Sequence, residues 1–130
     1  MRKRILIVDC EWQLLVYAMG TLRRTGYDVL AESDGAAALA LVDRWHPDLV
    51  IAPSSVVSTW QKQAPEGLGS LLPASSLLIT AKSDDPDRLW RRWAAQGYEI
   101  LLKPVVHQLE LQTAIEAAMS ASPEPGGVSA

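Results

Sequence analysis

Short runs of aliphatic residues recur along the chain and predict buried strands. The first, Ile5-Leu6-Ile7-Val8, contains no polar residue and is rich in β-branched side chains. Unbroken runs of this kind are typical of parallel strands that are covered on both faces. Similar runs follow at residues 28–31, 49–52, 77–79 and 100–102. The pattern therefore predicts five buried strands.

Amphipathic patterns with three- and four-residue spacing separate these runs and predict helices. The first helix stops at Gly26, and the second begins after Asp34, a residue well suited to cap a helix. A later helix opens at Asp85 and is expected to end at Gly97, and the last one runs from about His107. The apolar stripes of these helices are Leu15, Ala18, Met19 and Leu22; Ala38, Val42 and Trp45; Leu89 and Trp93; and Leu111, Ile115 and Ala118.

Strands and helices alternate along the chain, so the strands should pair in parallel through right-handed crossovers. The predicted architecture is a three-layer α/β sandwich. Its third crossover is the weak part, because Pro65, Gly67 and Pro73 interrupt residues 54–76 and only residues 56–63 resemble a short helix. We therefore expect a degraded third helix.

Length and composition agree with one folded domain. The chain has 130 residues, of which 48% are hydrophobic and 21% are charged. It therefore has room for one core and lacks the composition of a disordered chain. Residues 1–121 form the predicted domain. Residues 122–130, which are rich in Pro, Gly and Ser, are expected to be a flexible tail or a linker remnant.

Charge and cysteine content limit the kinds of function and the compartments that are expected. The formal net charge of −3 excludes an overall positive field, so direct binding of nucleic acid is not expected. The single cysteine, Cys10, cannot form an internal disulfide, and no leader peptide precedes the first strand, which favours the cytoplasm. The longest apolar stretch, residues 36–42, is far shorter than the roughly 18 residues that span a bilayer, so no membrane segment is predicted.

Polar residues follow the predicted strands and should meet at one rim of the sheet. In an open parallel sheet, ligands bind beyond the carboxyl ends of the strands, where the strand order reverses. An acid, hydroxyls and an amine converge there. The segments that follow strands one, three, four and five are Asp9-Cys10-Glu11, Pro53-Ser54-Ser55, Thr80-Ala81-Lys82 and Lys103-Pro104.

Several stretches, in order, resemble the receiver domain of two-component response regulators. The resemblance covers the chain from about Arg4 to Ser120 and implies a flavodoxin-like fold with strand order 2-1-3-4-5. No single stretch is decisive, but matches at several strand ends in the right order are specific. The matching stretches are Ile5-Leu6-Ile7-Val8-Asp9, Gly26-Tyr27-Asp28-Val29, Asp34-Gly35 with Ala38-Leu39, Pro47-Asp48-Leu49-Val50-Ile51, Leu78-Ile79-Thr80-Ala81 and Lys103-Pro104.

The resemblance also implies a phosphorylation site, which is degenerate in this chain. In the family, paired acids after strand one and an aspartate ending strand three hold Mg²⁺, and that aspartate accepts a phosphoryl group from a histidine kinase. Asp9, Thr80 and Lys103 match the family pattern, whereas Cys10 and Pro53 replace the second acid and the phosphoacceptor. A proline side chain has no nucleophile, and a thiol is a soft ligand that suits Mg²⁺ poorly. We therefore expect an atypical receiver, or pseudo-receiver, with no metal, no cofactor and no enzymatic activity.

Two tryptophans on the fourth predicted helix indicate a contact surface. Leu89 and Trp93 share the stripe that faces the sheet, which turns Trp90 outward beside Arg91. The resemblance adds that receivers bind partners through helix four, strand five and helix five. The expected partner is a protein, namely a histidine kinase, an output domain or a second copy in a homodimer. The alternative is that Trp90 simply covers the aliphatic stem of Arg88 or Arg91.

Three other interpretations of the rim stay open. Asp9 can form an ion pair with Lys103, while Thr80 and Lys103 remain as relics that close an empty pocket. A small anion or metabolite can occupy the rim in place of phosphate, with Lys103 and Thr80 as its contacts. A flavodoxin-like enzyme that binds a nucleotide or a flavin is disfavoured, because the loop Cys10-Glu11-Trp12-Gln13 has no glycine to let the backbone approach a phosphate.

Overall fold

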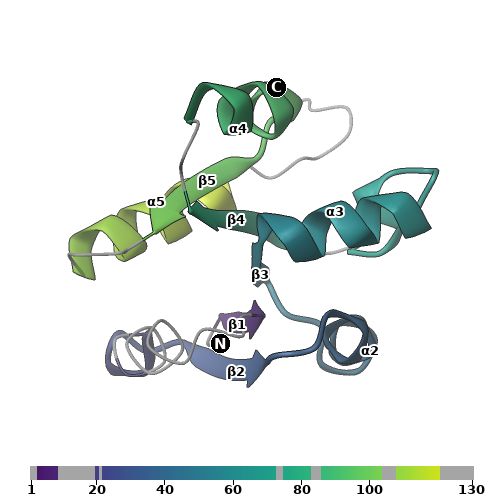
Figure 1. The fold of residues 1–130 in the computed structure, drawn as a ribbon. Coiled ribbons are helices and arrows are strands. Elements are labelled where there is room, and N and C mark those ends of the chain that lie inside the picture. Colours follow the sequence, from purple (N-terminus) through teal and green to yellow (C-terminus); the bar gives the residue numbers. More distant parts are fainter. Residues whose placement is uncertain are drawn as a thin grey trace, which may run out of the picture.

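A computed structural model of the chain describes residues 3–8, 20, 22–72, 75–82, 86–103 and 108–120. A five-stranded parallel sheet in the order β2-β1-β3-β4-β5 forms its centre, as predicted (Figure 1). The predicted tail, residues 122–130, lies outside the described residues. The strands are β1 (Arg4–Val8), β2 (Asp28–Glu32), β3 (Leu49–Pro53), β4 (Ser76–Lys82) and β5 (Glu99–Lys103).

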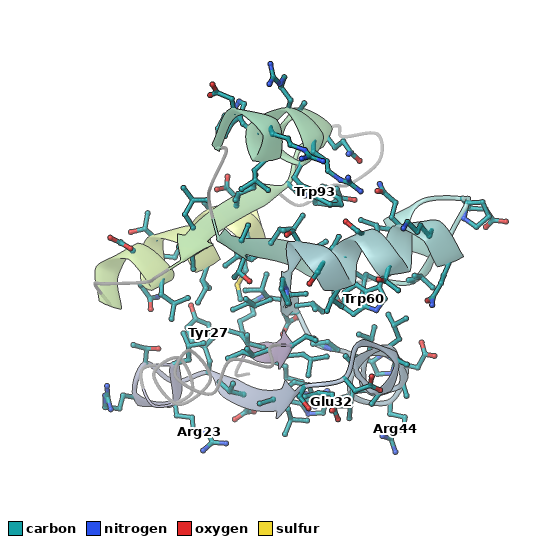
Figure 2. The ribbon with its side chains drawn as sticks, viewed as in Figure 1. Arg23, Tyr27, Glu32, Arg44, Trp60 and Trp93 are labelled. Carbon is teal, nitrogen blue, oxygen red and sulfur yellow. The ribbon has the colours of Figure 1, made fainter. Side chains whose placement is uncertain are left out.

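Helices cover both faces of the sheet and complete the three layers (Figure 1). Buried residues of α2 (Gly35–Trp45) and α3 (Ser54–Gln63) form one core cluster with residues of β1, β3 and β4. A second cluster on the other face joins the sheet to Leu22 and to α5 (Gln108–Ser120). The predicted stripe of Leu111, Ile115 and Ala118 is buried there. The side chains of Trp60 and Trp93 point inward, whereas Arg23 and Arg44 point away from the sheet (Figure 2).

The central strands have the buried character that their aliphatic runs predict. In β1, Leu6 and Val8 belong to one core cluster while Ile5 and Ile7 belong to the other. This alternation follows from the two-residue period of a strand. The prediction of five buried strands was wrong for the two edge strands, β2 and β5. In β2 only Val29 is buried and Leu30 is 38% exposed, and in the run 100–102 of β5 only Leu101 is buried. The other edge, β5, leaves Leu102 40% exposed.

Local signals set the ends of α2. The Asp34 carboxylate accepts a hydrogen bond of 3.0 Å from the Ala37 backbone N–H, as expected of an N-cap. The helix ends at His46, which has a left-handed backbone (φ 54°) and donates its N–H to the Val42 carbonyl. The predicted stripe is also found, since Ala38 and Val42 are buried and Trp45 packs against the same cluster.

The third crossover is short and irregular, as predicted. Helix α3 begins at Ser54, slightly before the predicted segment, and ends at Gln63. The chain then turns through Gly67, whose φ of 107° favours glycine, into a single 3-10 turn, η1 (Leu68–Ser70). The Trp60 indole N–H donates to the Gly35 carbonyl over 3.2 Å and ties α3 to the start of α2.

The fourth helix is shorter than its pattern predicts. Helix α4 (Pro86–Arg92) ends five residues before Gly97, where the sequence analysis placed its end. A 3-10 turn, η2 (Ala94–Gln96), continues it, and Gly97 closes that turn with a φ of 95°. Asp85, the predicted cap, lies outside the described residues. Within the described part of the chain, no helix is long and apolar enough to cross a membrane.

Candidate functional site

The carboxyl ends of β3 and β4 meet where the sequence analysis places the candidate site. Pro53 is the last residue of β3, is half-buried, and is the register partner of Thr80 on β4. Ile51 and Leu78 belong to the core cluster that packs against α5. Because side chains alternate along a strand, Pro53 and Thr80 lie on that same face of the sheet.

Thr80 holds a buried polar atom at this rim. The residue is 1% exposed, and its Oγ1 atom has no hydrogen-bond partner among the residues that the structure describes. A buried hydroxyl left unpaired costs about 1–3 kcal/mol. Thr80 therefore presents an unused hydrogen-bonding group beside Pro53.

Helix α3 begins directly after Pro53 and adds donors to the rim. Its N-cap is Pro53, which makes no side-chain capping hydrogen bond. The first backbone N–H groups of a helix have no partner within the helix, and those at the start of α3 receive no side-chain cap from Pro53. The rim therefore offers hydrogen-bond donors and hydroxyls, while β3 contributes no carboxylate.

The other predicted site residues are only partly located. Asp9 and Cys10 directly follow β1 but lie outside the described residues. Lys103 ends β5 as the register partner of Lys82, and the structure describes only its backbone. Among the described residues, no group of three or more His, Cys, Asp or Glu side chains is placed to hold a metal ion.

Trp90 on α4 and Trp93 directly after this helix have the exposures that the sequence pattern predicts. Trp93 is 1% exposed, and the Arg92 guanidinium lies 4.8 Å from the centre of its ring. Trp90 is 66% exposed and is the most exposed large hydrophobic residue in the described part of the chain. Arg91 beside it is also exposed, so this end of α4 presents an aromatic ring and positive charge.

A groove also lies between β5 and α5, and no pattern in the sequence predicts it. It encloses about 610 Å³, and small residues of α5 leave space beside the edge strand. Two acidic residues stand in its lining, which makes its charge opposite to that of α4. The lining consists of Glu99, Ile100, Leu101, Glu110, Thr113, Ala114 and Ala117.

Comparison with known proteins identifies the fold and finds one sequence match. No protein-family model matches the chain. A 51-residue stretch is 41% identical to the alkaline phosphatase synthesis transcriptional regulatory protein PhoP of Bacillus subtilis. That match covers 39% of this chain and 21% of PhoP, so the chain spans about a fifth of the curated relative it matches.

Solved receiver structures share the fold over nearly the whole chain. A response regulator from Thermotoga maritima superposes with a TM-score of 0.75 at 16% identity, covering 92% of this chain and 99% of that one. The signal receiver domain of a LuxO repressor protein from Vibrio parahaemolyticus gives 0.71 at 19% identity, covering 92% of each chain. The fold is therefore that of the CheY-like receiver domains of response regulators.

Proposed function

We propose that this domain acts in two-component signalling as an atypical receiver that binds a protein partner without being phosphorylated at the end of β3. The observation that carries the proposal is Pro53, which occupies the last position of β3 beside Thr80. The domain acts in the cytoplasm by binding and not by catalysis. Its partners are a histidine kinase, an output domain or a second copy of the chain.

The chemistry of position 53 supports independence from phosphorylation. Phosphoryl transfer needs a nucleophile in line with the phosphorus and cations that neutralise the developing charge. Pro53 supplies no nucleophilic atom, and Cys10 supplies a soft sulfur where a hard oxygen ligand suits Mg²⁺. Ser54 and Ser55 follow at once, but a serine hydroxyl needs an adjacent base before it becomes a good nucleophile.

Acetyl phosphate and beryllofluoride are expected to leave the protein unchanged. Incubation with Mg²⁺ and acetyl phosphate should add no phosphoryl mass, because Pro53 cannot accept it. Intact-mass spectrometry measures this, with a receiver that keeps its aspartate as the positive control. A stable phosphoryl group mapped to residues 53–55 would contradict the proposal, and Ser54→Ala and Ser55→Ala would show which hydroxyl accepted it.

A second candidate function is the binding of a small anion at the rim. It is favoured by the Thr80 hydroxyl, which has no partner among the described residues, and by the start of α3, which no side chain of Pro53 caps, because backbone N–H groups at a helix start attract anions. Titrating the same samples with inorganic phosphate discriminates between the candidates. A rise in melting temperature that Thr80→Val abolishes favours the anion, whereas no rise favours the interaction module alone.

The face formed by α4, β5 and α5 supports the partner proposal. Trp90 and Arg91 project from α4, and the groove between β5 and α5 carries Glu99 and Glu110. Exposed aromatic residues and arginines often dominate protein interfaces. Because the two parts of this face have opposite charge, a second copy of the chain is one partner that fits it.

Trp90→Ala is expected to weaken self-association or kinase binding by on the order of 2 kcal/mol while the fold stays intact. The reason is that the substitution removes the most exposed ring of this face. Sedimentation equilibrium and titration against a histidine kinase measure the effect. The matched control is Leu30→Ala, which removes an exposed side chain from the opposite edge strand, β2. If the two variants behaved alike in both assays, Trp90 would not be part of the interface.

A further inference from the structure

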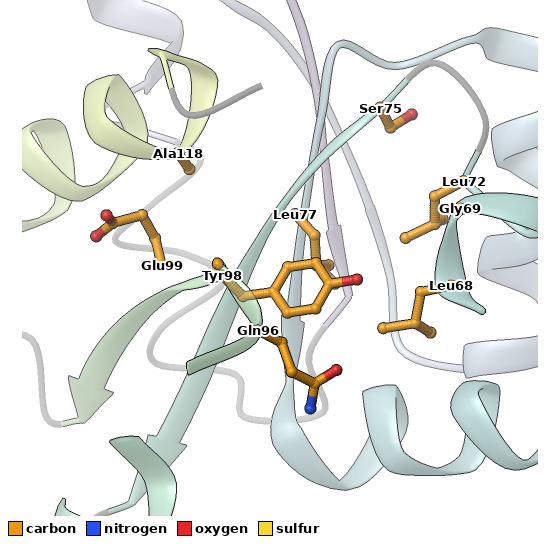
Figure 3. A pocket seen from close by; sticks show the side chains of 10 residues that line it. Leu68, Gly69, Leu72, Ser75, Leu77, Gln96, Tyr98, Glu99 and Ala118 are labelled. Atoms are coloured by element: carbon orange, nitrogen blue, oxygen red, sulfur yellow. The ribbon is translucent and has the colours of Figure 1, made fainter. Parts of the chain in front are cut away.

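A cavity lies at the end of the sheet opposite to Pro53 and Thr80. It encloses about 280 Å³ beneath the amino ends of β4 and β5, where the irregular segment after α3 passes the start of both strands (Figure 3). It shares no lining residue with the rim or with α4. The lining residues are Leu68, Gly69, Leu72, Ser75, Leu77, Gln96, Gly97, Tyr98, Glu99 and Ala118.

Hydrogen bonds fix the wall that the irregular segment contributes. The carbonyl of Leu68 accepts the backbone N–H groups of Leu71 and Leu72, each over 3.0 Å. The Ser75 hydroxyl, just before β4, donates to the Pro47 carbonyl over 2.7 Å and so ties this residue to the loop before β3. Leu68 and Leu72 are both buried. The cavity wall is therefore preformed, as ligand sites usually are.

Tyr98 provides the central ring and one available polar group. Its backbone N–H donates to the Trp93 carbonyl, and its ring packs edge-on to Trp93 with 6.5 Å between ring centroids. Figure 3 shows this ring across the cavity, with the hydroxyl on the side of Leu68 and Leu72. No hydrogen bond of that hydroxyl to another described residue is found. Burial raises the pKa of Tyr98 above its usual 10.0, so the hydroxyl remains a donor at neutral pH.

The lining also restricts the charge of a ligand. Among the described residues that line it there is no Lys, Arg or His, and the ionisable group besides Tyr98 is Glu99, which lies on the side of Ala118 (Figure 3). The amide of Gln96 is already engaged, because its Nε2 donates to the Arg92 carbonyl. Anions would meet a carboxylate without a compensating cation, so phosphates, nucleotides and carboxylates are disfavoured.

We propose that this cavity is a binding site for a compact, one-ring aromatic molecule that is neutral or cationic and accepts a hydrogen bond from Tyr98. A volume of about 280 Å³ lies at the lower end of the range of ligand pockets, which suits a single ring and excludes a flavin or dinucleotide. The leucine side chains and the Tyr98 ring supply apolar contact. The Glu99 carboxylate adds negative charge at the Ala118 side of the cavity and points away from the Tyr98 ring (Figure 3). This site goes beyond the proposed function, because it lies away from the rim and from α4 and has only Glu99 in common with the groove between β5 and α5.

The test uses three probes that share a phenol ring and differ in charge: 4-ethylphenol, tyramine and 3-(4-hydroxyphenyl)propionate. Titration of the whole chain is followed by amide NMR shifts. The neutral and cationic probes should shift the amides of Gly69, Gly97 and Tyr98, and the anionic probe should bind at least about tenfold more weakly. Shifts confined to other residues, no shifts up to 10 mM probe, or equal binding of all three probes would overturn the proposal.

Variants of the lining test the assigned contacts. Tyr98→Phe keeps the ring and removes the hydroxyl, so affinity for 4-ethylphenol should fall about fivefold, the loss of one net hydrogen bond. Glu99→Gln should raise the affinity of the anionic probe. Ala118→Leu should fill the cavity and abolish binding; if it fails to fold, Tyr98→Phe and Glu99→Gln still decide the proposal. Leu30→Ala, on the far edge strand β2, shares no residue with the cavity; it is the control and should bind all three probes like the unaltered chain.

The result is separable from that of the proposed function. Pro53→Asp alters the opposite end of the sheet and should leave probe binding unchanged. Phosphorylation of the unaltered chain would therefore contradict the proposed function alone. Absence of probe binding would contradict the cavity proposal alone.

Discussion

Trp93→Ala is expected to lower the free energy of unfolding by about 3–5 kcal/mol, whereas Trp90→Ala three residues earlier should change it by less than about 0.5 kcal/mol. Trp93 is 1% exposed and holds α4 onto the core cluster shared with α2 and α3. Removing the indole leaves a void beside Tyr98 and takes away the ring over which the Arg92 guanidinium lies. Trp90 is 66% exposed and fills no such space.

Urea denaturation followed by circular dichroism measures both effects, and it avoids the loss of tryptophan signal that the substitutions cause. Trp93→Phe is the intermediate control, because it keeps an aromatic ring against Tyr98 and should retain a large part of the stability. Domains of this size are usually stable by about 5–15 kcal/mol, so Trp93→Ala removes a large share of the total. Similar losses for Trp90→Ala and Trp93→Ala would contradict the division of α4 into a buried and an exposed side.

The parts of the fold that could be predicted from the sequence are those that local patterns encode. The runs at β1 and β3 are unbroken and aliphatic because both strands are covered on two faces. Asp34 and Gly26 mark helix ends through capping and positive φ, effects that act within a few residues. The Pro and Gly residues after α3 likewise indicate the loss of regular helix there.

The errors concern features that depend on neighbours distant in the sequence. Val29 and Leu30 have the same aliphatic character as the central strands, yet β2 is an edge because of the order of strands, which the run itself does not contain. At the point where α4 gives way to η2, Trp93 is buried against core residues of α2, α3 and the central strands, which the local pattern of α4 does not contain.

Part of the candidate site could likewise be predicted from the sequence, and part could not. The approach of Pro53 to Thr80 is predictable, because parallel strands bring their carboxyl ends to one rim. The cavity at Tyr98 was not predictable, because its walls come from the turn at Leu68, the start of β4, the start of β5 and the end of α5. No local spacing relates these segments, and only packing creates the space between them.

The second large effect is expected from restoring the acids that the receiver resemblance assigns to this rim. Cys10→Asp combined with Pro53→Asp should create an Mg²⁺ site, because three carboxylates, including that of Asp9, then converge and repel one another until a cation binds. Without metal this repulsion should lower the free energy of unfolding. With metal, binding to the folded state should raise it by about 2.7 kcal/mol when free Mg²⁺ is 100 times its Kd.

The single variants separate this effect from a simpler one. Pro53 is the N-cap of α3 and makes no side-chain capping bond, so Pro53→Asp alone should stabilise the helix start by about 1 kcal/mol whether or not Mg²⁺ is present. Cys10→Asp alone provides too few hard ligands. The isosteric control, Cys10→Asn with Pro53→Asn, keeps shape and capping ability but lacks the charge that attracts Mg²⁺. Melting temperature with and without Mg²⁺, and with Ca²⁺ for comparison, measures all four proteins. A folded double aspartate variant that melts identically with and without Mg²⁺ would show that Cys10 and Pro53 do not share one cation site, and the degenerate phosphorylation site inferred from them would have to be abandoned.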